Sequence, residues 1–145
     1  SSPDLYVTAV HPQVEVKTSD ARQILKKNIQ MKDAVKQWGN VAGLVAGILK
    51  NDNKLISRSL EDVLVEPVRS ILIPKFDEVK KQSLALGALG GGISGSGPSI
   101  FMLSETKEIA DKVAENMQKI YNEIGIENFV YVSKINDMGI KLVES

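Results

Sequence analysis

The chain has 145 residues, equal numbers of basic and acidic residues, and no cysteine. Its length suits one compact domain covering residues 1–145, and its dispersed charges lack the basic patch of a nucleic-acid-binding protein. The absence of cysteine excludes disulfides and fits a cytoplasmic location. The apolar runs are too short to span a membrane. The single histidine cannot build a histidine-based metal site.

The first third of the chain predicts a strand, a short helix and a long helix. Residues 5–10 form an apolar strand, and residues 13–17 alternate like an exposed one. Thr18, with Ser19 and Asp20, is typical of the N-cap of a short helix. A longer helix over residues 33–50 carries apolar side chains at helical spacing, which predicts a face buried in the core. These residues are Val35, Trp38, Val41, Ala42, Val45, Ile48 and Leu49.

Three glycines of the long helix, Gly39, Gly43 and Gly47, are four residues apart, which predicts close packing by another helix or strand. Further along, residues 60–64 indicate a short helix that Glu66-Pro67 would stop. Pro74 suits the first turn of another helix, whose inward face would carry Phe76, Val79, Ser83 and Leu86.

The last third indicates a long helix after Ser104 and Glu105, with Gly125 as its C-cap. Strands are predicted over residues 129–135 and 139–143. The order of elements favours an α+β two-layer sandwich, in which helices cover one face of an antiparallel sheet, close to a ferredoxin-like arrangement.

A glycine-rich stretch, GGGISGSGPS, runs from Gly90 to Ser99. A Walker phosphate loop requires a lysine and a following helix, but here Pro98 and an apolar strand follow. We therefore expect a hairpin with a wide glycine tip, and its composition permits either a plain turn or the close approach of another molecule. The candidate residues near a phosphate site are Gly91, Gly92, Ser94, Gly95, Ser96 and Gly97.

Two of the three arginines are candidates for binding an anionic ligand, because a guanidinium recognises carboxylate or phosphate in a bidentate manner. Arg22 lies in the first short helix, and Arg69 follows Glu66-Pro67. The alternative is that both are surface arginines paired with nearby acids. Thr18 could contact the same ligand or cap its helix.

The remaining polar candidates give weaker signals. His11, beside Pro12, is interpreted as a turn residue rather than a catalyst. Asp20, Glu66 and Asp137 are candidate bases, but no pair among them has a spacing that singles out acid–base catalysis. The sequence therefore assigns no catalytic residue and no metal ligand.

Three segments together resemble the homoserine kinases of the GHMP kinase superfamily. The glycine stretch resembles the third motif of that superfamily, and TSDAR (residues 18–22), EPVRSILIP (residues 66–74) and GISGSGPSIF (residues 92–101) follow in the order found in homoserine kinases. The resemblance runs from Val7 to the C-terminus. It implies the C-terminal half of an enzyme that transfers the γ-phosphoryl group of ATP to the hydroxyl of L-homoserine in threonine biosynthesis.

The resemblance also implies roles for the candidates. Arg22 and Arg69 would hold the amino acid's carboxylate, Thr18 would line the same pocket, and the glycine loop would pack against the phosphate loop of an N-terminal half. That ATP-binding half, with its Mg²⁺-associated acids, has no counterpart here, so we expect the chain alone to bind no cofactor and to be inactive. We expect the missing N-terminal domain to be a partner, and exposed sheet edges allow a homodimer.

Two alternatives remain open at this stage. The chain could belong to a GHMP kinase that acts on mevalonate, a sugar or another small alcohol, although the contexts of Arg22 and Arg69 argue against this. It could also be a non-catalytic, ACT-like module that binds an amino acid, although such a module has no need of the glycine motif.

Overall fold

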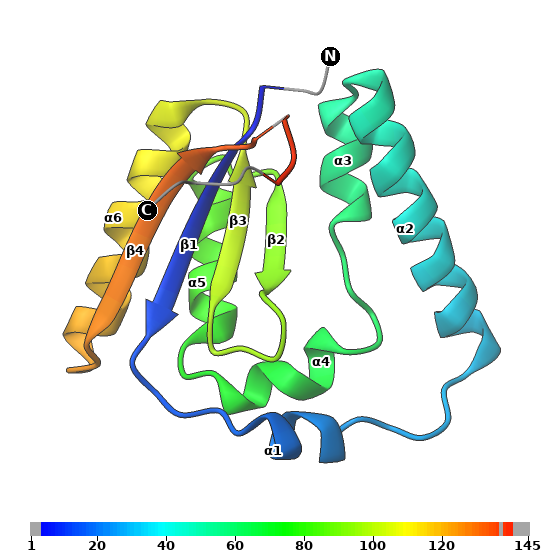
Figure 1. The fold of residues 1–145 in the computed structure, drawn as a ribbon, viewed down its shortest axis with the longest axis horizontal. Helices are drawn as coiled ribbons and strands as arrows, with labels where there is room; N and C mark the ends of the chain where they lie inside the picture. Colours follow the sequence, from blue (N-terminus) through cyan, green and yellow to red (C-terminus); the bar gives the residue numbers. More distant parts are fainter. Residues whose placement is uncertain (1–3, 137, 141–145) are drawn as a thin grey trace.

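The computed structural model describes residues 4–136 and 138–140 of the chain. In this part, four strands form one antiparallel sheet in the order β2-β3-β1-β4 (Figure 1). Their bounds are Tyr6–Pro12 for β1, Gly90–Ile93 for β2, Ile100–Ser104 for β3 and Asn128–Lys134 for β4. The strand predicted over residues 129–135 is therefore confirmed, with a shift of one residue.

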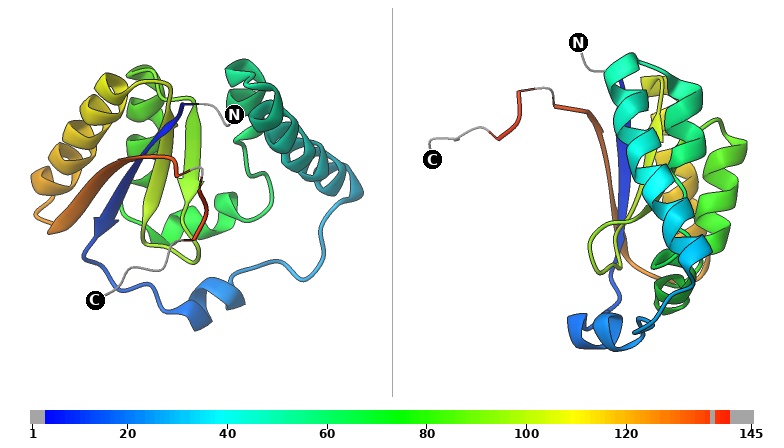
Figure 2. Two further views of the ribbon diagram at one scale, coloured as in Figure 1. Left: turned by 45° about the horizontal axis from the view of Figure 1, so that its top comes forward. Right: turned by 90° about the vertical axis from the view of Figure 1, so that its right-hand side faces the viewer.

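Two helices, α5 (Phe76–Ala85) and α6 (Lys107–Glu123), cover one face of the sheet, and no helix of the described residues lies on the other face (Figure 2). The predicted α+β sandwich is confirmed. Alternate residues of β1 and β3 point into the core, as the period of two requires. Val10, Ile100 and Met102 are fully buried there against the apolar stripe of α6. The caps of α6 are Thr106 and, beyond its end, Gly125 at φ +71°, so the predicted glycine stop is confirmed.

Helices α2 (Met31–Lys50) and α3 (Asn53–Ser59) pack against each other at one side of the sheet. Asn51 adopts a left-handed conformation that ends α2, and the Asp52 carboxylate accepts the Leu55 N–H at 2.9 Å to cap α3. A Cβ at Gly47 would lie 2.9 Å from Cγ1 of Ile56, and one at Gly43 would overlap Oγ of Ser59. Close packing is thus confirmed at these two glycines, whereas Gly39 has no atom within 4 Å of such a position.

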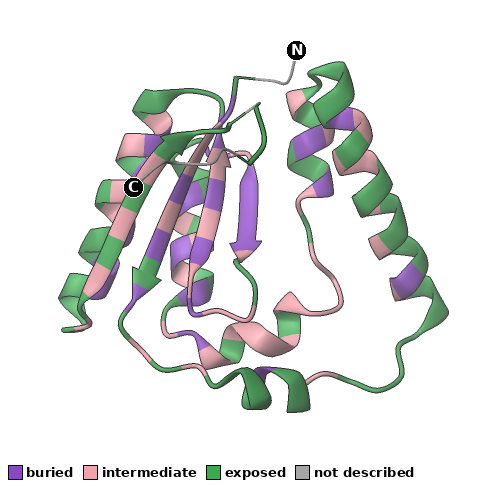
Figure 3. Cartoon of the chain, viewed as in Figure 1, coloured by how far each residue is buried: buried purple, intermediate pink, exposed green. Residues whose placement is uncertain are grey.

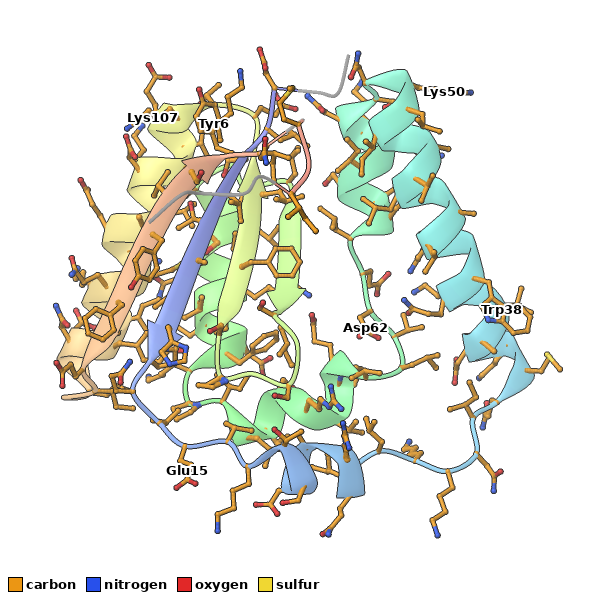
Figure 4. The ribbon with its side chains drawn as sticks, in the orientation of Figure 1. Tyr6, Glu15, Trp38, Lys50, Asp62 and Lys107 are labelled. Atoms are coloured by element: carbon orange, nitrogen blue, oxygen red, sulfur yellow. The ribbon has the colours of Figure 1, made fainter. Side chains whose placement is uncertain are left out.

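The apolar face of α2 is not buried, so the prediction that it belongs to the core is wrong. Most residues of α2 are exposed (Figure 3), and Trp38 lies on the side of the helix away from the sheet (Figure 4). Trp38 is 62% exposed and Leu49 is 77% exposed. The physical reason is that α2 packs on α3 through its glycines, and no described segment covers the other side.

Several local predictions are also wrong. Residues 13–17 are not a strand, because no neighbouring strand pairs with them. No helix spans residues 60–64, and Glu66-Pro67 begins a helix rather than ending one. That helix is α4 (Glu66–Arg69), and the 3-10 turn η1 (Ser70–Leu72) follows it. Pro67 fits the first turn of α4 because no N–H partner is needed there.

Other corrections concern element ends. Helix α5 begins at Phe76 after Lys75, so Pro74 precedes its first turn, and Leu86 lies beyond its end and is exposed. His11 lies within β1 rather than in a turn. Of the strand predicted over residues 139–143, only Gly139 and Ile140 are among the described residues, and they are not in a strand. Asp137 lies outside the described residues.

Candidate functional site

Arg69, the last residue of α4, connects three segments that are far apart in the sequence. Its Nε donates a hydrogen bond to the carbonyl oxygen of Ala21 at 2.9 Å, and its Nη1 donates to that of Gly95 at 3.4 Å. Ala21 belongs to α1 (Thr18–Gln23), and Gly95 lies in the turn between β2 and β3. Figure 1 shows α1 beside α4 at one end of the sheet. The structure therefore brings together the three segments that the sequence singled out.

Helix α1 exposes its candidate residues Thr18 and Arg22 to solvent, while the carbonyl of Ala21 between them is bonded to Arg69. Ala21 is fully buried, whereas Thr18 and Arg22 are exposed. Within the described residues, the Arg22 side chain takes part in no hydrogen bond or ion pair. The predicted N-cap is wrong: the capping position is Lys17, and no side chain there accepts a hydrogen bond. Thr18 is therefore available for a contact other than capping.

The glycine stretch forms the predicted hairpin, but its first four residues are strand rather than loop. Gly91 and Gly92 are buried in β2 opposite Met102 and Phe101. No side chain fits at Gly91, because its Cβ would overlap the Phe101 backbone. Within this hairpin, glycine is required by strand packing as well as by the turn.

The turn proper covers residues 94–99. Ser94 donates its N–H to the Ser99 carbonyl at 2.8 Å and accepts the Gly97 N–H at 3.1 Å. Gly95 and Gly97 have φ values of +63° and +82°, which side-chain-bearing residues rarely adopt. Ser96 Oγ lies 3.4 Å from the Gly97 carbonyl oxygen, which makes a weak bond. The turn exposes Ser94 and Gly95 next to Arg69.

Glu66, at the start of α4, forms a shielded ion pair with Lys80 of α5. Its Oε2 occupies the space that a side chain at Gly92 would fill: an ideal Cβ there would lie 2.6 Å from this oxygen. Burial raises the pKa of Glu66 above its ordinary value, while the hydrogen bond and charge of Lys80 act in the opposite direction. Glu66 was one of the candidate bases in the sequence. Because its carboxylate is already paired with Lys80, it is poorly suited to that role.

The segment before α4 is shaped by Asp62. Its Oδ1 accepts the N–H groups of Leu64 and Val65, both at 2.8 Å, and its Oδ2 accepts that of Glu66 at 3.2 Å. This is the Asx-type turn chemistry that ends a loop and starts a helix. Asp62 was not among the residues predicted from the sequence, although an aspartate shortly before Glu-Pro is a signal for the start of a helix.

A pocket of about 230 Å³ lies beside this network, between β2, α2 and residues 59–66. Its lining includes Val41, Leu44, Leu60, Glu66, Gly92 and Phe101. Figure 4 labels Asp62 in the segment between α3 and α4, on the side of α2 that faces the sheet. The pocket is mainly apolar, and its acidic members already have partners.

A second polar contact ties the glycine turn to the sheet. His11 Nδ1 and Ser99 Oγ lie 2.7 Å apart, at the ends of β1 and of the turn. No sequence pattern indicated this pair, because the two residues are 88 positions apart. Across residues 4–136 and 138–140, no group of three or more histidine, cysteine, aspartate or glutamate side chains could hold a metal ion. None of the helices in that range is long and apolar enough to cross a membrane.

The family model described as "GHMP kinases C terminal" matches residues 44–123. A homoserine kinase from Chloroherpeton thalassium is 48% identical over 142 residues, which cover 97% of this chain and 44% of the relative. The chain thus spans less than half the length of the curated relatives it matches.

Solved structures show the same fold. The crystal structure of homoserine kinase from Cytophaga hutchinsonii is 56% identical and superposes with a TM-score of 0.90 over 94% of this chain and 44% of the other. A phosphomevalonate kinase from Streptococcus pneumoniae, at 20% identity, has a TM-score of 0.69 over 92% of this chain and 40% of the other. At that identity, the second likeness shows the fold alone.

Proposed function

The chain belongs to the GHMP kinase C-terminal family, and from this membership we propose that it is the substrate-binding part of an ATP-dependent homoserine kinase. The reaction transfers the γ-phosphoryl group of ATP to the hydroxyl of L-homoserine, giving O-phospho-L-homoserine, ADP and a proton. Such a step belongs to threonine biosynthesis in the cytoplasm. The observation that carries the proposal is the convergence of α1, α4 and the glycine turn on Arg69.

Under this proposal, Arg22 and Arg69 bind the carboxylate of homoserine and Thr18 lines the same pocket. A planar guanidinium fixes the direction of a carboxylate, so the substrate hydroxyl is held toward the phosphorus atom. Arg22 is exposed and Arg69 is partly exposed at the same end of the domain, which leaves both open to a ligand. Phosphoryl transfer depends mainly on positioning and charge stabilisation, so orienting the acceptor is a substantial contribution.

The glycine turn would form one wall of the phosphoryl-transfer site. The candidates Gly91, Gly92, Ser94, Gly95, Ser96 and Gly97 all lie in β2 or in the turn that follows it. ATP and Mg²⁺ would be bound chiefly by an N-terminal domain of the complete protein, which is the proposed partner of residues 1–145. We therefore expect the 145-residue chain alone to catalyse no transfer.

A homodimer is also proposed, through the exposed face of α2. Six apolar side chains expose more than half of their surface there: Met31, Val35, Trp38, Val41, Val45 and Leu49. Each of these side chains exposes on the order of 100 Å² of apolar surface, so the six together offer on the order of 600 Å² per copy. That approaches the roughly 800 Å² that each partner buries in a standard interface. A two-fold dimer would use the same face of both copies.

The experiment that tests the proposed function measures ADP release by the complete protein with MgATP and a panel of acceptors. We expect turnover with L-homoserine and at least 100-fold lower kcat/KM with L-threonine and mevalonate, because the wrong acceptor misplaces its hydroxyl. Faster transfer to mevalonate than to homoserine would replace the proposed substrate, and binding without transfer to any acceptor would favour a non-catalytic module.

A further inference from the structure

The Glu66–Lys80 pair differs from every other ion pair in the described part of the chain. The Glu66 and Lys80 side chains are only 14% and 19% exposed, whereas each of the other pairs exposes more than a third of both side chains. Exposed pairs of that kind contribute little to a structure. A shielded pair is different, because removal of one partner leaves the other charge without compensation in a poorly solvated place.

The glycine at position 92 is explained by this pair rather than by backbone conformation. Gly92 lies in β2 and has no positive φ, so its backbone would accept any residue. The obstacle is Glu66 Oε2, which lies 2.6 Å from where a Cβ would stand. Glu66 thus contacts both α5, through Lys80, and the glycine strand, through the bare backbone of Gly92.

Helix α4 has only four residues, so its own hydrogen bonds cannot fix its position. Three side chains hold it instead. Asp62 accepts N–H groups at its start, Glu66 joins its first turn to α5 and β2, and Arg69 at its end reaches Ala21 and Gly95. The position of the Arg69 guanidinium therefore depends on the contacts that Asp62 and Glu66 make at the start of α4.

We propose that Glu66 is a positioning residue: its contacts with Lys80 and Gly92 set α4 against the glycine strand, so that Arg69 reaches α1 and the glycine turn together. This inference deepens the proposed function, and its kinetic consequence rests on that function. Glu66 itself touches no reacting atom in this account. Its effect on substrate passes through Arg69.

The test uses the complete protein and has one readout that needs no substrate. NMR follows the solvent exchange of the Arg69 Nε–H proton, which the hydrogen bond to Ala21 protects. In Glu66→Gln this proton is expected to exchange at least tenfold faster, and the KM for homoserine is expected to rise about tenfold while kcat changes less than threefold. Glu78→Gln, which removes the partner of Lys75 in an exposed pair at the start of α5, is the matched control and should change neither quantity.

A second variant keeps the test decisive if Glu66→Gln does not fold. Gly92→Ala keeps both charged partners of the pair but places a methyl group 2.6 Å from Oε2 of Glu66, so it should displace the carboxylate, accelerate the Arg69 exchange and raise KM. Exchange and KM within twofold of wild type in a folded Glu66→Gln or Gly92→Ala protein would overturn the inference. Failure of the wild type to phosphorylate homoserine would instead refute the proposed function, and Arg69 exchange would still decide the role of Glu66.

Discussion

Arg69 donates from Nε to the carbonyl oxygen of Ala21 across 2.9 Å, although the two residues are 48 positions apart in the chain. The acceptor is the residue directly before Arg22. One candidate arginine therefore anchors the helix that carries the other, and the two are coupled through the backbone of α1.

This coupling predicts that Arg69→Lys loosens α1. A lysine ammonium cannot reproduce the fixed, planar donors that reach Ala21 and Gly95 together. Hydrogen exchange of the Arg22 amide, near the end of α1, should therefore accelerate by roughly tenfold, which corresponds to about 1.4 kcal/mol. Arg58→Lys, a change at an exposed arginine of α3, is the control. Unchanged exchange in the Arg69 variant would show that α1 is held by other contacts.

The glycines of α2 offer a matched pair of stability tests. Gly47→Ala places a methyl group 2.9 Å from Cγ1 and 3.0 Å from the backbone nitrogen of Ile56. We expect the free energy of unfolding to fall by about 1–3 kcal/mol, as in other overpacked sites. Gly39→Ala meets no neighbour and should raise it by roughly 0.5–1 kcal/mol, because alanine favours the helix. Urea unfolding measures both, and equal effects of the two substitutions would contradict the packing described for α2 and α3.

Tyr121 makes stability depend on pH in the alkaline range. Its hydroxyl donates to the Pro74 carbonyl at 2.9 Å, and burial raises its pKa to about 12 from 10.0. Because the folded state holds this proton more tightly, the stabilisation is complete below pH 10 and is lost as pH rises toward 12. The loss is on the order of 2 kcal/mol.

The measurement compares wild type with Tyr121→Phe by urea unfolding between pH 9 and pH 12. Phenylalanine cannot ionise, so the free-energy difference between the two proteins should shift in favour of the variant as pH rises. Other alkaline titrations are common to both and cancel. A difference that stays constant across this range would contradict the account of Tyr121.

The exposed face of α2 predicts self-association that depends on Trp38. Trp38→Glu places a charge at the centre of the proposed interface, and burial of an unpaired charge is costly. We expect sedimentation equilibrium of the complete protein to show a dimer for wild type and a dissociation constant raised at least 100-fold in the variant. Tyr131→Glu, a change at an exposed aromatic residue of β4, is the control. A dimer that survives Trp38→Glu would place the interface elsewhere.

Much of the fold could be predicted from local patterns. Helix α6, its stop at Gly125 and the glycine hairpin follow from periodicity and turn chemistry, which act within a few residues. The exposure of the apolar α2 face could not be predicted in this way. An apolar stripe shows that a helix has a face to cover, but not whether residues of the same chain cover it.

In the candidate site, too, local features could be predicted from the sequence, whereas contacts between distant residues could not. The sequence singled out Arg22, Arg69 and the glycine stretch because each is an unusual residue type in an informative context. It did not indicate that Lys80 neutralises Glu66, that Ser99 meets His11, or that Gly92 makes room for a carboxylate. These contacts join residues 14, 88 and 26 positions apart, and a single sequence carries no pattern that pairs them.

The KM for L-homoserine of the complete protein carrying Arg69→Leu tests the central claim most directly. Leucine keeps part of the side chain's bulk and removes every donor. If Arg69 binds the substrate carboxylate, loss of a charged hydrogen bond worth about 1.5–3 kcal/mol should raise KM by about 10- to 150-fold. An unchanged KM, in a variant that folds and turns over homoserine, would contradict the assignment of this end of the domain as the substrate site.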